Sequence, residues 1–156
     1  KGQIAPLRSY IEKEIFPTFH WRDNRWVNEL TIKTIFMCLL MDDTNFLMIS
    51  ERQSRSGYAD LAMIVRSDRR IFKLIDSLIE FKFIKAKSLK IDKKIIKKMT
   101  DTALFKLDPV KTKLNEARTQ ARKYSKELME EFGDIVKLHT YAIISIGFER
   151  LLYKKL

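Results

Sequence analysis

Two short apolar segments, each interrupted by charged residues, constrain the fold of this chain more than any other feature. Residues 58–65 read YADLAMIV and residues 78–84 read LIEFKFI, and a polar stretch that includes Ser67 to Arg70 separates them. Apolar runs of this length, bounded by polar turns, predict β-strands. We therefore expect these two segments to pair as an antiparallel hairpin with a moderately long connection.

The segments before the hairpin predict two helices and a further strand. Apolar residues at four-residue spacing predict a short helix over Leu7 to Phe16 that ends at Pro17. A second helix is predicted over Arg25 to Met41, and its all-apolar end, IFMCLLM, indicates burial on every side. Cys38 lies in this end and is therefore expected to be buried and inert. FLMIS, residues 46–50, predicts a strand.

The segments after the hairpin complete an α/β pattern. Lys90 to Thr100 is basic and either helical or irregular, and Val110 to Glu131 has the clearest helical periodicity, with Gly133 as its C-cap. Leu138 to Phe148 is apolar on both faces, which is typical of an interior strand. The order of helix, three strands, helix and strand predicts a mixed central β-sheet flanked by helices.

Composition limits the domain organisation and the partners. The chain has 156 residues, only 4 Gly and 3 Pro, and no linker-like stretch, so we expect a single domain over residues 1–156. It begins with Lys rather than Met, and we expect it to be excised from a longer protein. A net charge of +11 favours a polyanionic partner. The single cysteine does not imply an oxidising compartment, and a cytoplasmic location is expected. No apolar run approaches the roughly 20 residues that span a membrane.

Three charged side chains stand inside the predicted strands. Glu80 and Lys82 are two residues apart and so share one face of their strand. If the hairpin turn is centred near Arg70, Asp60 falls opposite Glu80. Two carboxylates that meet at a strand edge repel, and a hard divalent cation such as Mg²⁺ or Mn²⁺ relieves that repulsion. The alternative is an ordinary cluster of Asp, Glu and Lys at the surface.

These segments resemble a known family. GYADLAMIV followed by LIEFKFIK is similar to the core of the PD-(D/E)XK nuclease superfamily, with Ala59 where a loosely kept proline stands, followed by Asp60, Glu80 and Lys82. The order of the predicted elements is also that of a restriction-endonuclease-like core, α-β-β-β-α-β. The resemblance runs from about Leu7 to the end of the chain.

Further positions carry the same resemblance. Glu29, in RWVNEL, stands where many members have a helix glutamate, and Gln120 with Tyr124 forms the QxxxY pattern of the RecB-like branch. More narrowly, RWVNELTIKT, the YADL and IEFKF segments and the terminal YAIISIGFERLL resemble the C-terminal nuclease-like domain that follows an AAA-ATPase-like module in many prokaryotic proteins of unassigned function. This likeness implies a possible ATPase-like module in the same polypeptide.

The resemblance implies hydrolysis of phosphodiester bonds, in DNA rather than RNA. Asp60 and Glu80 would ligate Mg²⁺ or Mn²⁺, with Glu29 completing the site directly or through water. Lys82 would orient the attacking water or offset charge on the phosphoryl oxygens. The QxxxY pair would steady its helix against the site or contact substrate phosphate.

Several alternatives remain open at this stage. Glu29 also stands four residues before Lys33 and could form a solvated helix salt bridge. Tyr124 lies on the apolar stripe of its helix and could belong to the core, and Gln120 could be exposed. The whole domain could also be a catalytically inactive nuclease fold that binds nucleic acid or a protein partner.

The region from Lys82 to Lys98 contains eight lysines and one acid, and so accounts for +7 of the net charge. Beyond Lys82, the lysines predicted to bind nucleic acid are Lys85, Lys87, Lys90, Lys93, Lys94, Lys97 and Lys98. The alternatives are a solvated helix face and, because the apolar stripe here is short, a weaker attachment to an anionic membrane. No aromatic residues interleave with these lysines, which argues against a base-stacking platform. Phe19, Trp21 and Trp26 are expected to pack the first helices onto the sheet.

Overall fold

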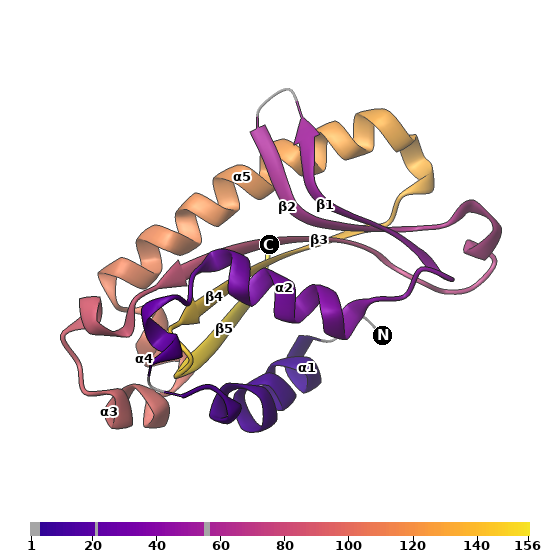
Figure 1. Cartoon of the computed structure of the whole chain (residues 1–156). Coiled ribbons are helices and arrows are strands. Elements are labelled where there is room, and N and C mark those ends of the chain that lie inside the picture. Colours follow the sequence, from indigo (N-terminus) through magenta and orange to yellow (C-terminus); the bar gives the residue numbers. More distant parts are fainter. Residues whose placement is uncertain (1–3, 21, 55–56) are drawn as a thin grey trace.

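The computed structural model describes residues 4–20, 22–54 and 57–156. Five strands form one mixed sheet in the order β1-β2-β3-β4-β5, in which only β3 and β4 are parallel neighbours (Figure 1). The predicted α/β class, a mixed central sheet flanked by helices, is confirmed. The helices and strands are α1 (Ile4–Tyr10), α2 (Glu29–Leu40), β1 (Phe46–Ser54), β2 (Gly57–Val65), β3 (Asp76–Ile84), α3 (Lys93–Lys98), α4 (Asp101–Phe105), α5 (Asp108–Phe132), β4 (Leu138–Ile146) and β5 (Arg150–Lys155).

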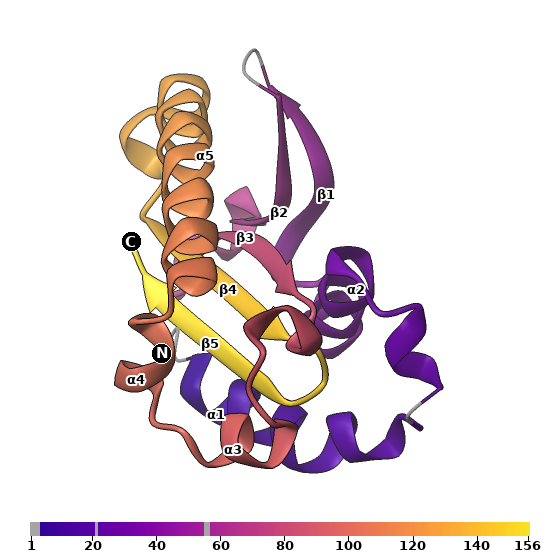
Figure 2. The same ribbon diagram turned by 90° about the vertical axis from the view of Figure 1, so that its left-hand side faces the viewer.

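Helices cover both faces of the sheet, because alternate side chains of its central strands are apolar on both sides (Figure 2). Ile79 and Phe81 of β3 face α1 and α2, and the rings of Phe81 and Phe36 meet at 5.1 Å. Leu78 and Ile84, on the opposite face of β3, pack beneath α5. The side chains of even-numbered residues in β3 therefore point towards α5.

Long elements with a strong pattern match the sequence predictions closely. The predicted hairpin is the pair β2 and β3, which is antiparallel. Helix α5 exceeds the predicted range by two residues at its start and one at its end. Gly133 caps it with a φ of +62°, a conformation that glycine adopts at little steric cost. The core of β4 is buried on both faces, as expected for an interior strand.

One strand was not predicted. The predicted strand over Leu138 to Phe148 corresponds to β4, and β5 follows it as an antiparallel neighbour after a turn at Gly147. Gly147 has a φ of +52°, which is a conformation that disfavours other residues. A single glycine among apolar residues is too weak a turn signal to separate two strands in the sequence.

The first two helices differ from their predictions. The first helical segment begins earlier, at Ile4, and continues through a π-helical turn and a 3₁₀ turn, so Pro17 lies inside its last turn. The end of α2 is not buried on every side, because α2 covers one face of the sheet and none of the described elements lies outside it. Cys38 is exposed, as are Leu39 and Met41, so the prediction of a buried cysteine was wrong.

Trp26 also differs from its prediction. It is 81% exposed and does not pack the first helices onto the sheet. Phe19 does pack there, with its ring stacked on Phe148 at 4.1 Å. Trp21 lies outside the described residues.

A buried carboxylate, that of Asp76, connects three strands at the end of the sheet where β3 begins. Asp76, the first residue of β3, accepts hydrogen bonds from the backbone N–H groups of Val65 (2.8 Å) and Lys137 (2.9 Å). It also pairs with the guanidinium of Arg70 at 3.1 Å. Val65 is the last residue of β2, and Lys137 directly precedes β4. Asp76 therefore holds the end of β2 and the starts of β3 and β4 together.

Candidate active site

The candidate site lies where β2 separates from β3, a point that we call the fork. The paired positions end at Leu61 and Ile79, and the β1–β2 hairpin then rises away from β3 (Figure 2). The same register makes Asp60 and Glu80 the next opposed positions, as the sequence predicted. The separation leaves one edge of β3 without a neighbouring strand, and side chains rather than backbone groups occupy that edge.

Two of the predicted site residues satisfy the backbone that the fork exposes. The N–H of Phe81 donates to Asp60 Oδ2 at 2.7 Å, and Lys82 Nζ donates to the carbonyl of Phe81 at 2.7 Å. Because a buried backbone group without a partner is costly, these contacts hold both charged side chains against β3. Asp60 and Lys82 therefore have fixed positions at the fork.

Glu80 is the most strongly perturbed group of the site. It is 1% exposed, and within the described residues neither of its carboxylate oxygens has a hydrogen-bond partner. Burial, followed by the negative charge of Asp60, raises the pKa of Glu80 to about 9. In the absence of a cation, this carboxyl is therefore protonated at neutral pH.

Lys82 links the two faces of the sheet at the fork. Its ammonium is buried and lies 3.5 Å from Glu29 Oε1 and 3.9 Å from Asp60 Oδ2. Glu29 is the first residue of α2, which begins there because the side chain of Asn28 accepts from the N–H of Thr31 at 3.0 Å. Burial raises the pKa of Glu29, while the charge of Lys82 opposes this shift.

The alternative helix pair between Glu29 and Lys33 does not form. Lys33, which is 4% exposed, instead pairs with Glu51 of β1. Glu51 has a φ of +52°, an unusual conformation for a residue other than glycine. Glu29 is thereby left to pair with Lys82 at the fork.

The structure separates the two members of the QxxxY pattern. Gln120 lines the same cleft as Glu29 and Lys82, and its Oε1 atom is buried without a partner among the described residues. Tyr124 is buried in the apolar cluster between α5 and β2, with Ala59 and Leu78. Gln120 therefore lies at the site, whereas the ring of Tyr124 belongs to the core.

An open cleft of about 690 Å³ leads to the fork between α2, β3 and α5. Asp60 and Glu80 contribute no surface to it, so a molecule in the cleft first meets Lys82 and Glu29. The remaining lining comes from α5, namely Thr112, Lys113, Asn115, Glu116, Thr119 and Gln120. Every residue that lines the cleft carries a polar or charged side chain, and the cleft is open to solvent.

A family model described as PD-(D/E)XK nuclease superfamily matches residues 27–154. The chain belongs to the PD-(D/E)XK nuclease superfamily. The match spans most of the chain and includes Glu29, Asp60, Glu80 and Lys82. Neither the curated proteins nor the solved structures contain a significant match to it. Members of the PD-(D/E)XK superfamily are generally nucleases that cleave phosphodiester bonds and typically use divalent metal ions.

The carboxylate oxygens at the fork fit a divalent cation that also binds water and substrate. Among the described residues, no group of three or more His, Cys, Asp or Glu side chains is arranged to hold a metal ion. The two unpartnered oxygens of Glu80, next to Asp60, nevertheless form the oxygen-rich environment that hard cations prefer. Mg²⁺ is commonly bound by one or two carboxylates together with water and substrate phosphate, so two carboxylates suffice in a PD-(D/E)XK domain. Glu29 is engaged by Lys82 and lies beside this pair.

The lysine-rich segment of this PD-(D/E)XK domain forms a turn after β3, followed by α3, and its seven predicted lysines are all exposed. Two of them, Lys93 and Lys97, share one acid, Glu149, at 3.0 and 3.1 Å, so that one of their two positive charges is offset. A second cavity of about 410 Å³ lies beside Lys85 and Lys87. Positive charge therefore continues from Lys82 along the surface.

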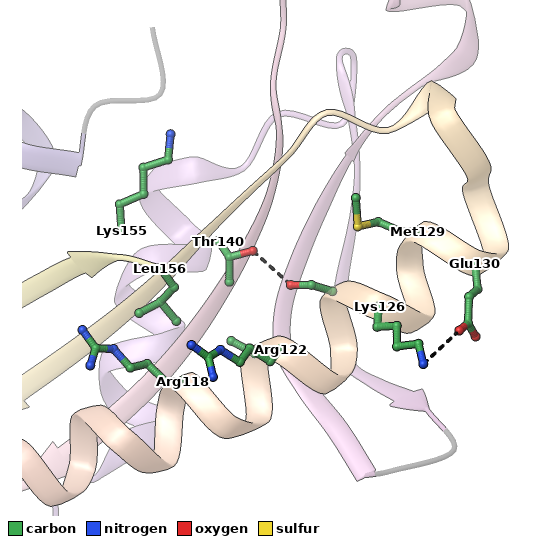
Figure 3. Close-up of a pocket in the computed structure, with 10 residues that line it drawn as sticks. Arg118, Arg122, Lys126, Met129, Glu130, Thr140, Lys155 and Leu156 are labelled. Carbon is green, nitrogen blue, oxygen red and sulfur yellow. Dashed lines mark hydrogen bonds and ion pairs between the residues drawn. The ribbon is translucent and has the colours of Figure 1, made fainter.

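A further basic cleft of about 810 Å³ lies on the opposite flank of α5 from the fork (Figure 3). Arg118 and Arg122 of α5 and Lys155 of β5 line it, and within the described part of the chain none of the three forms an ion pair. Ser125 and Thr140 share a hydrogen bond at 3.1 Å in its wall. Sequence reasoning missed this cleft because its residues come from distant elements.

No helix in the described residues has the length and apolarity needed to cross a membrane.

Proposed function

We propose that this PD-(D/E)XK domain is a metal-dependent nuclease that hydrolyses phosphodiester bonds, in DNA rather than RNA. The observation that carries the proposal is the meeting of Asp60, Glu80 and Lys82 at the fork, with the carboxylate of Glu80 buried and unpartnered. An ionised carboxylate is costly to bury unless a cation occupies the space beside it, and without a cation Glu80 avoids this cost by remaining protonated. The preference for DNA is supported by the family resemblance.

In this proposal, Asp60 and Glu80 would hold Mg²⁺ or Mn²⁺, with Glu29 completing the site directly or through water. When bound, such a cation polarises a phosphoryl oxygen and lowers the pKa of a bound water. Lys82 keeps a fixed positive charge near the phosphate, because Phe81 and Glu29 hold its ammonium in place. Gln120 offers an unpartnered amide oxygen in the cleft, where it can accept a hydrogen bond from substrate or from an attacking water.

The nuclease proposal is tested with purified protein, Mg²⁺ or Mn²⁺, and four substrates: supercoiled plasmid, linear duplex, single-stranded DNA and RNA. Asp60→Asn, Glu80→Gln and Lys82→Met are each expected to lower cleavage at least about 100-fold without unfolding the protein. Glu116→Gln, in the rim of the same cleft, serves as the matched control and should cleave normally. Equal cleavage by wild-type protein and Glu80→Gln would overturn the assignment, and faster cleavage of RNA would reverse the proposed preference.

The lysine-rich segment is proposed to hold the nucleic-acid backbone. The slope of log affinity against log salt concentration is negative, and each phosphate contact makes it more negative by about one. Replacing Lys85 and Lys87 with Ala should therefore weaken binding and make this slope less negative by about two. In the matched control, Arg118 and Arg122 are replaced with Ala, which removes the same amount of positive charge from the opposite flank of α5. If both double variants weaken binding equally, the lysines act only through net charge.

A second candidate function is a catalytically inactive module that binds nucleic acid or a protein partner. One observation favours it: Lys82 already engages Glu29, the carboxylate that would complete the metal site. Calorimetric titration with Mn²⁺ distinguishes the two functions. A nuclease should bind Mn²⁺ with a heat that Glu80→Gln removes, whereas an inactive module should give no heat that depends on Glu80.

We also propose that this single domain, residues 1–156, forms part of a longer cytoplasmic polypeptide that carries an AAA-ATPase-like module. The support is the resemblance of its strand and helix segments to the C-terminal nuclease-like domains found behind such modules. The flanking coding sequence tests this proposal directly. An open reading frame without an ATPase-like module would contradict it.

A further inference from the structure

Trp26 is the most unusual surface side chain near the candidate site. It is 81% exposed, whereas tryptophan is highly buried on average in folded proteins. It lies at the end of a short 3₁₀ turn, Asp23–Arg25, and its backbone N–H donates to the carbonyl of Asp23 at 3.0 Å. The backbone is therefore held in place while the indole projects into solvent.

Trp26 lines neither of the two cavities at the site, but its neighbours in the chain line both of them. Its neighbours Arg25 and Val27 line the cavity beside Lys85 and Lys87. Glu29, three residues further on, lines the cleft at the fork. Because consecutive Cα atoms are 3.8 Å apart, the Cα of Trp26 lies within about 11 Å of that of Glu29.

The charge around Trp26 indicates what its indole can bind. Within the described residues, neither Lys85 nor Lys87 forms an ion pair, and both line the cavity that the residues on either side of Trp26 also line. An aromatic side chain beside unpaired cations is the arrangement with which proteins bind single-stranded nucleic acid: the bases stack on the ring and the phosphates meet the cations. In the sequence, this aromatic residue is about 60 positions from the lysines, which is why no stacking platform was predicted.

We propose that Trp26 stacks on an unpaired base of a nucleic acid whose backbone contacts Lys85 and Lys87, so that the preferred substrate has a single-stranded segment next to the fork. The inference rests on the proposed nuclease function and specifies its substrate. In duplex DNA the bases already stack on each other, and their faces are not available to the indole. Trp26 therefore discriminates in favour of single strands, frayed ends and flaps.

The test measures binding rather than cleavage, in the presence of EDTA. Fluorescence anisotropy is recorded with a 12-nucleotide oligothymidine and with a duplex of equal length. Trp26→Ala should weaken single-strand binding by at least about 5-fold, since one stacked base contributes about 1–3 kcal/mol. Duplex binding should remain unchanged, and Trp26→Phe should restore most of the single-strand affinity. Leu30→Ala, which removes a neighbouring exposed apolar side chain (59% exposed), is the matched control and should bind as the wild type does.

Each outcome supports or overturns the inference. If Trp26→Ala binds the single strand as tightly as the wild type, or weakens both ligands equally, the stacking role is excluded. The nuclease proposal still stands in that case, provided that the Lys85 and Lys87 variant loses affinity and metal-dependent cleavage persists. If wild-type protein neither binds nor cleaves any nucleic acid, both proposals fail.

Discussion

Glu80→Gln should make the protein more stable at neutral pH and should also remove the proposed nuclease activity. The carboxyl of Glu80 is buried without a hydrogen-bond partner among the described residues, and its pKa in the folded protein is raised to about 9 from its ordinary value of 4.5. The folded state therefore binds a proton that the unfolded state releases between these two pH values. Stability is thus highest below the unfolded pKa and falls as the pH rises towards 9.

The magnitude follows from the same two pKa values. Within this window, each pH unit costs about 1.4 kcal/mol of unfolding free energy. From pH 4.5 to pH 7, the loss amounts to about 3 kcal/mol, a large fraction of the stability of an ordinary domain. Glutamine has a similar shape and no charge, so Glu80→Gln should lack this pH-dependent loss.

Urea unfolding followed by circular dichroism between pH 5 and pH 8 measures the effect. The difference in unfolding free energy between Glu80→Gln and wild type should widen with a slope of about 1.4 kcal/mol per pH unit. Glu116→Gln, at an exposed position that pairs with Lys113, should retain the wild-type slope. Added Mg²⁺ should stabilise wild-type protein and not Glu80→Gln. Parallel pH curves for wild type and Glu80→Gln would refute the reasoning.

Three other substitutions test the remaining contacts by urea unfolding. Asp60→Ala should cost about 1–3 kcal/mol because it leaves the N–H of Phe81 without an acceptor, whereas Asp60→Asn keeps an acceptor and should remain stable although inactive. Asp76→Ala should lower the unfolding free energy by about 3–5 kcal/mol, since it leaves two backbone donors without an acceptor and a guanidinium without its carboxylate. A loss below about 1 kcal/mol would contradict the role of Asp76 in holding the strands together. Glu51→Ala should lower the unfolding free energy by about 1–2 kcal/mol, and by more than Lys33→Met does, because only Glu51→Ala leaves a buried ammonium unpaired. A larger loss for Lys33→Met would show that the ion pair does not stabilise the fold.

Features that depend on neighbouring residues were predictable from the sequence. Alternation along β3 places Glu80 and Lys82 on one face, and the distance of each strand from the connecting turn set Asp60 opposite Glu80. The helix α5 followed from its periodicity, and Gly133 followed from the need for a cap. By contrast, a single glycine did not reveal that Leu138–Phe148 ends in a turn and that a fifth strand follows.

Features that depend on how distant elements pack were not predictable. From the sequence, Glu29 could pair with Lys33 on its own helix. In the structure β1 places Glu51 beside Lys33, and Glu29 pairs with Lys82 instead. The exposure of Cys38 likewise follows from the absence of a layer outside α2, which no local pattern shows.

The sequence by itself determined the class of fold, the strands at the centre of the sheet and the identity of the charged residues in them. Local periodicity specifies these features because it sets which face of a strand or helix each side chain occupies. Only the tertiary structure decided that β2 leaves β3 at Asp60, that the carboxylate of Glu80 is buried without a partner among the described residues, and that the residues flanking Trp26 share a cavity with Lys85. Burial and the distances between charges depend on residues far apart in the chain, and these quantities set the pKa values and contacts from which a function can be argued.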